Sequence, residues 1–209
     1  GLKLKSQIDF EFLGMSEDEA RELERKIEQE FSLWADSTAC DIERLDNFSE
    51  LQQLAFLNWL MSGDVLVTLP TTKRPGMPYD LRVRLIEADR LSNPMGNTDP
   101  HIIGGEEVNP AGEVIAYHIS THHPLSWEYS ETKWTRVEAY GAATGRRNVL
   151  HVMNRERIGQ RRGVPFLAPV IEALKQLGQY TDAELTAAIV SGLFTVAIEK
   201  DENSEDMVG

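Results

Sequence analysis

Hydrophobic residues recur every three or four positions through residues 1–63, which is the spacing of an amphipathic helix. A first run follows a capping box formed by Ser16 and Glu19, and its apolar positions are Leu23, Ile27, Phe31 and Trp34. A second capping box, Asn47 with Glu50, precedes a second run, and Gly63 stands where that run would end. The pattern predicts two helices.

From Asp64 the spacing changes to alternation, which indicates β-strands. The segments with this pattern are 64–70, 81–91, 112–121, 133–141 and 146–153. Residues 92–112 are rich in turn formers and are predicted to hold at most one short strand. We expect a mostly antiparallel sheet flanked by the N-terminal helices, with Arg82 and Arg84 on its solvent face. Its predicted interior-facing residues are Val65, Val67, Val83, Leu85, Ile115, Tyr117, Val149 and His151.

Helical spacing returns at Pro165, a residue type favoured in the first turn of a helix. The apolar positions are Leu167, Val170, Ile171, Leu174, Leu177, Leu185, Ile189, Leu193 and Val196, in one helix or in two that meet near Gly178. Helices, then strands, then a long helix predict the α+β class. We divide the chain into an α+β region at 1–164, a long helix at 165–200 and an acidic tail at 201–209. We expect Leu174 in the core, so that Leu174→Asp destabilises the fold far more than Arg161→Ala.

Composition narrows the classes of function. The 34 acidic and 21 basic residues give a net charge of -13, which argues against a protein that coats nucleic acid, because phosphate binding needs a positive surface. No apolar run reaches the roughly 18 residues that span a bilayer, so we expect no membrane partner. The one cysteine, Cys40, is expected to be a buried or incidental thiol.

The basic loop "RIGQRRG", residues 157–163, directly precedes the last predicted helix. Backbone amides at a helix start and nearby arginines can hold a phosphate. The chain, however, contains neither GxxxxGK[ST] nor GxGxxG, so nucleotide binding is unsupported and we predict no cofactor. We favour a tight loop whose arginines pair with carboxylates of a neighbour.

Three histidines stand close together in "YHISTHHP", at His118, His122 and His123. The β-branched residues around them favour a strand, where residues four apart are separated by roughly 13 Å, too far for one metal ion. No HExxH or CxxC motif accompanies them. We therefore predict no metal site and no catalytic residue.

Four stretches in order resemble the lambda family of phage portal proteins. They are "CDIERLDNFSELQQLAFLNWLMSGDVLVTL", "LRVRLIEADRLSNP", "GEVIAYHIS" with its following "HHP", and the segment from "VLHVMNRERIGQRRGVPFLAP" to "LTAAIVSGLFTVAI". The resemblance runs from about Ile8 to Lys200. Its most specific part is the strand containing His151, the "GQRRGVP" loop, "LAP", and a helix that contains "YTDAELTAA".

The resemblance implies a structural, non-enzymatic subunit of a ring, usually a dodecamer, at one vertex of a tailed-phage capsid. Double-stranded DNA passes through such a ring, the terminase motor and head–tail connector proteins attach to it, and assembly takes place in the host cytoplasm or from a prophage. The chain is expected to be an excerpt that holds the wing region and the start of the stem. The parts that dock the motor are expected beyond Gly209.

The resemblance also assigns candidate contacts at subunit interfaces or near DNA. In the basic loop and just before it they are Arg155, Arg157, Arg161 and Arg162, for which we favour carboxylates of an adjacent subunit over DNA phosphates. In the last helix they are Glu184, Ala187, Ala188 and Ser191, where small side chains allow close helix packing. We expect the isolated chain to be monomeric or weakly associated. Its last helix is expected to fold back on the wing, pair with another copy, or fray after Gly192.

Two other functions stay open at this point. One is a capsid-associated hydrolase that uses His118, His122 or His123. The other is a scaffold-binding adaptor that uses the N-terminal helices without forming a ring. Metal analysis and turnover assays distinguish the hydrolase from a portal protein. The mass of the assembled full-length protein distinguishes the adaptor from a portal protein.

Overall fold

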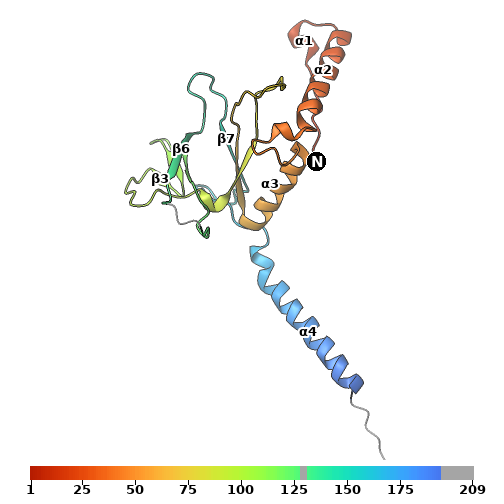
Figure 1. The fold of residues 1–209 in the computed structure, drawn as a ribbon, viewed down its shortest axis with the longest axis vertical. Coiled ribbons are helices and arrows are strands. Elements are labelled where there is room, and N and C mark those ends of the chain that lie inside the picture. Colours follow the sequence, from red (N-terminus) through yellow and green to blue (C-terminus); the bar gives the residue numbers. More distant parts are fainter. Residues whose placement is uncertain (128–130, 194–209) are drawn as a thin grey trace, which may run out of the picture. The chain divides into compact units, whose positions relative to one another are not determined.

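The computed structural model describes residues 1–127 and 131–193, and the chain divides into two compact units (Figure 1). The first unit is Gly1–Phe166 and contains both predicted N-terminal helices and all the strands. The second unit begins at Leu167 and contains the C-terminal helix. The predicted α+β class is confirmed.

Both predicted N-terminal helices are present with their capping boxes. A short α1 (Phe10–Leu13) precedes α2 (Glu17–Ala35), which starts at the Ser16–Glu19 box. A 3-10 turn, η1 (Thr38–Cys40), leads to α3 (Phe48–Ser62), which starts at the Asn47–Glu50 box. Gly63 ends α3 with φ +88°, a conformation that residues with a Cβ rarely adopt.

The strands form two antiparallel sheets, where the sequence analysis expected one. The first sheet has the order β2 (Arg84–Glu87), β1 (Asp64–Thr68), β7 (Val149–Met153). The second has the order β3 (Ile102–Ile103), β4 (Glu106–Val108), β5 (Val114–Ser120), β6 (Trp134–Glu138). A 3-10 turn, η2 (Ala88–Arg90), follows β2. Residues 92–112 thus supply two short strands, one more than predicted.

Two apolar cores stabilise the first unit. One lies between the sheets and consists of Leu66, Ile86, Leu91, Tyr117, Ile119, Ala139 and Val149. The other joins the helices to the first sheet and consists of Trp34, Cys40, Leu51 and Val83, with Phe31 and Phe48 packed against it. In the second core the Trp34 and Phe48 rings are 5.3 Å apart, and the Trp34 indole N–H donates to the Leu81 carbonyl at 3.0 Å.

Most of the predicted interior positions are buried or half-buried. Val65, Val83, Tyr117 and Val149 are buried, and Val67 and Leu85 are half-buried. His151 is intermediate as a residue, but its side chain is only 5% exposed. Ile115 was predicted wrongly, because it is 37% exposed. The β4–β5 register shifts between Glu107 and Val108, which leaves Ile115 as the extra residue of a β-bulge and turns it out of the core.

Arg82 was also predicted wrongly, because its side chain is completely buried. It lies before β2, where the chain runs between Asp41 and Thr71 through isolated bridges at Val83 and Leu81. Both faces are covered there, so alternation no longer separates an inner from an outer face. Arg84, one pleat further on, is exposed as expected.

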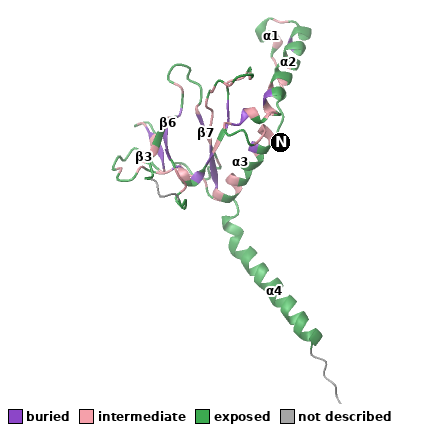
Figure 2. Ribbon diagram, in the orientation of Figure 1, coloured by how far each residue is buried: buried purple, intermediate pink, exposed green. Residues whose placement is uncertain are grey.

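The C-terminal helix starts later than predicted and has no buried residue (Figure 2). A 3-10 turn, η3 (Ala168–Val170), precedes α4 (Ile171–Leu193), which continues through Gly178 as one helix. Leu174 is 54% exposed, so its predicted place in the core is wrong. The expectation that Leu174→Asp exceeds Arg161→Ala in its effect on stability loses its basis. Fraying after Gly192 concerns residues outside the described ranges.

No helix within residues 1–127 and 131–193 is both long and apolar enough to cross a membrane.

Candidate functional site

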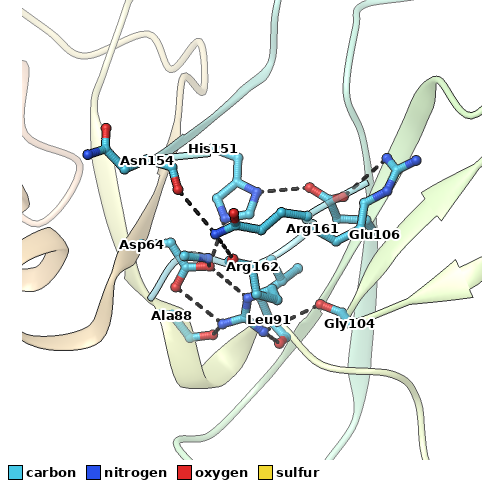
Figure 3. Close-up of polar contacts among 11 residues, drawn as sticks. Asp64, Ala88, Leu91, Gly104, Glu106, His151, Asn154, Arg161 and Arg162 are labelled. Atoms are coloured by element: carbon cyan, nitrogen blue, oxygen red, sulfur yellow. Dashed lines mark hydrogen bonds and ion pairs between the residues drawn. The ribbon is translucent and has the colours of Figure 1, made fainter. Parts of the chain in front are cut away.

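Five charged side chains meet where the basic loop crosses the first sheet (Figure 3). We call them the anchor cluster: Asp64, Glu106, His151, Arg161 and Arg162. The Asp64, Glu106 and His151 side chains are each no more than 5% exposed. They come from β1, β4 and β7, and the arginines come from the loop that leads toward α4. The cluster therefore joins both sheets to the basic loop.

Strand register places Asp64 beside His151. In the β1–β7 ladder Asp64 pairs with Met153 and Leu66 pairs with His151. Because alternate residues share a face of a sheet, Asp64 and His151 lie diagonally on the same face. Glu106 reaches His151 from the second sheet, where it pairs with Tyr117. The Tyr117 and His151 rings meet edge to face at 6.1 Å.

His151 bridges two carboxylates. Its Nδ1 lies 2.8 Å from Glu106 Oε1 and its Nε2 lies 2.9 Å from Asp64 Oδ2. Carboxylates accept hydrogen bonds, so this geometry suits a doubly protonated imidazolium that donates from both nitrogens. Burial by itself lowers the pKa of His151, but the bonds to Asp64 and Glu106 outweigh it and raise the pKa above its ordinary value.

Asp64 also holds the basic loop directly. Arg162 Nε donates to Asp64 Oδ2 at 2.7 Å and Arg162 Nη2 donates to Oδ1 at 3.3 Å, and the Gly163 amide donates to Oδ2 at 3.1 Å. Burial alone would raise the pKa of Asp64, but the hydrogen bonds from His151 and Arg162 lower it to about 2. Asp64 is therefore ionised at neutral pH.

Arg162 satisfies the rest of its guanidinium with backbone carbonyls. Nη1 donates to Leu91 O at 2.7 Å and Nη2 donates to Ala88 O at 2.7 Å, with a longer bond from Nη1 to Gly104 O at 3.4 Å. These carbonyls belong to η2, the residue after it, and the β3–β4 turn. One side chain thus connects the loop to β1, to the η2 segment and to the β3–β4 turn.

Arg161 makes the weaker contact of the two. Its Nη1 lies 3.5 Å from Glu106 Oε2 and its Nη2 donates to Gly112 O at 2.9 Å. Glu106 therefore links His151 to Arg161.

Tyr117 pairs with Glu106 in the β4–β5 ladder. Burial, and then the negative charge of Glu106, raise the pKa of Tyr117 to about 12, so its hydroxyl stays neutral at pH 7.

Two glycines allow the basic loop to pass against the end of α3. A Cβ atom on Gly163 would overlap the Gly63 carbonyl oxygen, and one on Gly63 would overlap the backbone of Val164. Backbone atoms do not move aside as a flexible side chain would. Glycine at both positions therefore brings Gly163 within reach of Asp64.

The anchor cluster is suited to holding a conformation and poorly suited to catalysis. Both His151 nitrogens are bonded to carboxylates, which leaves no ring nitrogen to take a proton from a substrate. Within residues 1–127 and 131–193, no group of three or more His, Cys, Asp or Glu side chains could hold a metal ion. The cluster instead fixes the path of the chain just before α4.

The four predicted arginines, Arg155 just before the basic loop and three within it, fall into two pairs. Arg161 and Arg162 have carboxylate partners in their own chain, whereas the predicted partners were carboxylates of a neighbouring subunit. Arg155 and Arg157 are exposed, and within the described ranges their side chains have no ion pair. Gln160 stabilises the turn between the pairs by donating to the Asn154 and Arg162 carbonyls. As interface or DNA-proximal residues, all four stay predictions.

The three clustered histidines have separate surroundings. His118 Nε2 lies 2.9 Å from Glu107, which also pairs with Arg136 at 2.7 Å. His123 Nε2 lies 3.2 Å from Asp89. The His122 carbonyl accepts a bond from the Ser120 hydroxyl. His122 and His123 follow the end of β5, as predicted, whereas His118 lies within β5 and pairs with Arg136 in the β5–β6 ladder.

The other sequence candidates lie apart from the anchor cluster. Glu184, Ala187, Ala188 and Ser191 are exposed on α4, in the second unit, and stay predictions as interface residues. Cys40 is buried, and burial raises the pKa of its thiol, which disfavours the reactive thiolate.

Sequence reasoning missed Asp64, Glu106 and the role of His151. One available signal was an aspartate at the first position of a strongly apolar strand, directly after the glycine that ends a helix. A charge at such a position is buried only with a partner. The partners of Asp64 are His151 and Arg162, 87 and 98 residues away, and a single sequence does not reveal such pairings.

Comparisons with known proteins agree on one family. The family described as "Phage portal protein, lambda family" matches residues 1–209. Portal protein B of Escherichia phage lambda is 24% identical over 206 residues, and the portal protein of Escherichia phage N15 is 23% identical over 207 residues. Each alignment covers 97% of this chain and 38% of the relative. The chain therefore spans well under half the length of these relatives.

Proposed function

Because the chain belongs to the lambda family of phage portal proteins, we propose that the whole protein is the structural subunit of a portal ring at a capsid vertex. In this role identical subunits surround the conduit through which double-stranded DNA enters and leaves the capsid. Terminase and head–tail connector proteins are its further partners, and its location is the virion, after assembly in the host cytoplasm. The observation that carries the proposal is the family match along the entire chain.

The exposed C-terminal helix supports assembly with other copies. Helix α4 has large apolar side chains along its length and no buried residue, and the exposed ones include Ile171, Leu174, Leu177, Tyr180, Leu185, Ile189 and Leu193. An apolar helix gains stability when other protein surfaces cover it. Ala187, Ala188 and Ser191 keep its C-terminal half narrow, which suits close packing between helices.

The charge distribution supports passage of DNA without tight binding. Each phosphate contact adds affinity and so resists sliding, whereas a net charge of -13 keeps general attraction to DNA low. The anchor cluster engages Arg161 and Arg162 within the chain, which leaves Arg155 and Arg157 as the loop cations open to a neighbouring carboxylate or a phosphate.

Mass photometry of the full-length protein tests the ring. We expect a single closed species of about twelve copies. A full-length protein that stays monomeric would instead support the scaffold-binding adaptor.

The hydrolase alternative has its own test. Metal analysis and incubation with protein and DNA substrates should give no stoichiometric metal and no turnover. Turnover that is lost in His118→Ala or His123→Ala would refute a purely structural role.

A further inference from the structure

A cleft opens between the facing surfaces of the two sheets, next to the core that joins them. Its volume is about 630 Å³. Ile86 of β2, Ile119 of β5 and Val137 of β6 supply its apolar lining. Hydroxyl groups of Thr68, Thr71, Thr121 and Thr135 stand among the lining residues. The cleft can therefore take an apolar side chain with polar groups around it.

The charged residues that line this cleft are both cationic. They are Arg84 and Arg90, and no described aspartate or glutamate lines it, although Glu43 and Glu87 lie near Arg90 outside the lining. Arg90 is fixed in place because its Nε and Nη2 both donate to the Ser120 carbonyl, at 3.0 and 2.9 Å. Arg84 has only a long contact of 3.8 Å to Glu43, and both of these side chains are largely exposed. A cationic cleft on a chain with a charge of -13 selects an acidic occupant.

The α1 tip, which we define as residues 9–18, has the groups that would complement this cleft: exposed apolar side chains flanked by carboxylates. Phe12 is 85% exposed and Leu13 is 56% exposed, and no residue of α1 is buried (Figure 2). Glu11 and Asp18 flank these apolar side chains and make no ion pair within the described ranges. The Asp9 carboxylate caps α1 by accepting from the Phe12 amide at 3.0 Å, which fixes the backbone that presents Phe12.

We infer that the α1 tip of one copy inserts Phe12 into the cleft between the sheets of a neighbouring copy, with Glu11 toward Arg84 and Arg90. The inference rests on the proposed function, since a ring requires two different surfaces of the same chain to contact each other. An exposed phenylalanine beside unpaired carboxylates and an apolar cleft lined by two arginines meet that requirement. Figure 1 shows α1 at the end of α2 that lies away from both sheets, so the contact is between copies.

Disulfide trapping tests the contact directly, because the chain has one natural cysteine and it is buried. Leu13→Cys marks the tip while keeping Phe12 and Glu11, and Thr135→Cys marks the cleft. A mixture of the two single variants, oxidised at high micromolar concentration, should give a mixed disulfide at least tenfold faster than the control mixture. The control combines Leu13→Cys with Ile158→Cys, whose side chain is fully exposed on the basic loop.

Charge reversal then tests the recognition. Adding Arg84→Glu to the cleft variant should slow trapping several-fold, and adding Glu11→Lys to the tip variant should restore it. Equal rates for the cleft pair and the control pair, or no effect of either charge reversal, would overturn the contact.

The full-length protein separates this inference from the function on which it rests. Phe12→Ser should weaken the ring in mass photometry relative to the wild type. A ring that persists equally in Phe12→Ser shows that the contact is wrong while the portal assignment stands. A wild-type protein that forms no ring refutes the portal assignment.

Discussion

The first unit buries its charges, whereas the C-terminal helix exposes its apolar side chains. Asp64 is fully buried with His151 and Arg162 as partners, whereas Leu174 is 54% exposed on α4. Burial of an ion pair requires neighbours that are already fixed, so the first unit contains what it needs to hold its own fold. An exposed apolar helix lacks such neighbours. We propose that the first unit folds by itself and that other copies cover α4 in the assembled protein.

Removal of the Asp64 charge should have the largest effect on the first unit. Asp64→Asn leaves His151 and Arg162 without their shared anion, and breaking a buried pair typically costs about 3–5 kcal/mol. Urea unfolding at pH 7 measures the change in the free energy of unfolding. Asp182→Asn, on exposed α4, is the matched control and should stay within about 0.5 kcal/mol of wild type. Similar losses in both variants would contradict a specific role of the cluster.

Two glycine substitutions should change stability in opposite directions in the two regions. Gly163→Ala forces a Cβ into the Gly63 carbonyl and should cost about 3 kcal/mol through overpacking. Gly178→Ala meets open space in a helix interior and should stabilise α4 by about 0.5–1 kcal/mol, seen as higher helicity in circular dichroism. A neutral Gly163→Ala would mean that the loop does not pass so close to α3.

Acid should weaken the first unit through Asp64. The pKa of Asp64 is about 2 in the folded chain and 3.8 ordinarily, so the folded state loses about 2 kcal/mol as pH falls from about 5 through 2. Denaturation at a series of pH values measures this slope. Asp64→Asn should reduce the decrease in the free energy of unfolding at acid pH. An unchanged decrease would mean that other carboxylates cause it.

The stability of the first unit at alkaline pH should depend on His151. Its pKa is raised on folding, so its contribution is complete below the ordinary value of 6.5 and is lost as pH rises through the higher folded value. His151→Gln, which does not titrate, should remove this alkaline loss. A variant that keeps the wild-type alkaline slope would contradict the bridging imidazolium.

The smallest effect is expected on α4. Leu174→Asp should change the stability of the 209-residue chain by less than about 0.5 kcal/mol, because Leu174 is already half exposed. Leu66→Ala, in the core between the sheets, should cost about 2–5 kcal/mol. Thermal denaturation compares the stability of the two variants. A large loss of stability in Leu174→Asp would show that Leu174 is packed in a core.

The sequence was most informative where structure is local. Capping boxes at Ser16 and Asn47 and the glycine at 63 act over a few residues, and each marks a helix end in the structure. Alternation located the longer strands. It failed at Ile115, where a bulge adds a residue, and at Arg82, where both faces are covered.

The anchor cluster could be predicted only in part. The arginine loop was identified as important, but its partners Asp64 and Glu106 are brought to it by the pairing of strands distant in the sequence. Leu174 shows the opposite problem, since helical periodicity indicates an apolar face without specifying whether the same chain covers it. The resemblance identified the family on which the proposed function rests, and the residue pattern predicted the fold class.

Hydrogen exchange compares the two regions in one experiment. In the 209-residue chain we expect slow exchange for the β1 and β7 amides around the anchor cluster and fast exchange along α4. In the assembled full-length ring, α4 should become as protected as β1. Strong protection of α4 in the isolated chain, or continued fast exchange in the ring, would contradict the account of a self-sufficient first unit and a helix completed by assembly.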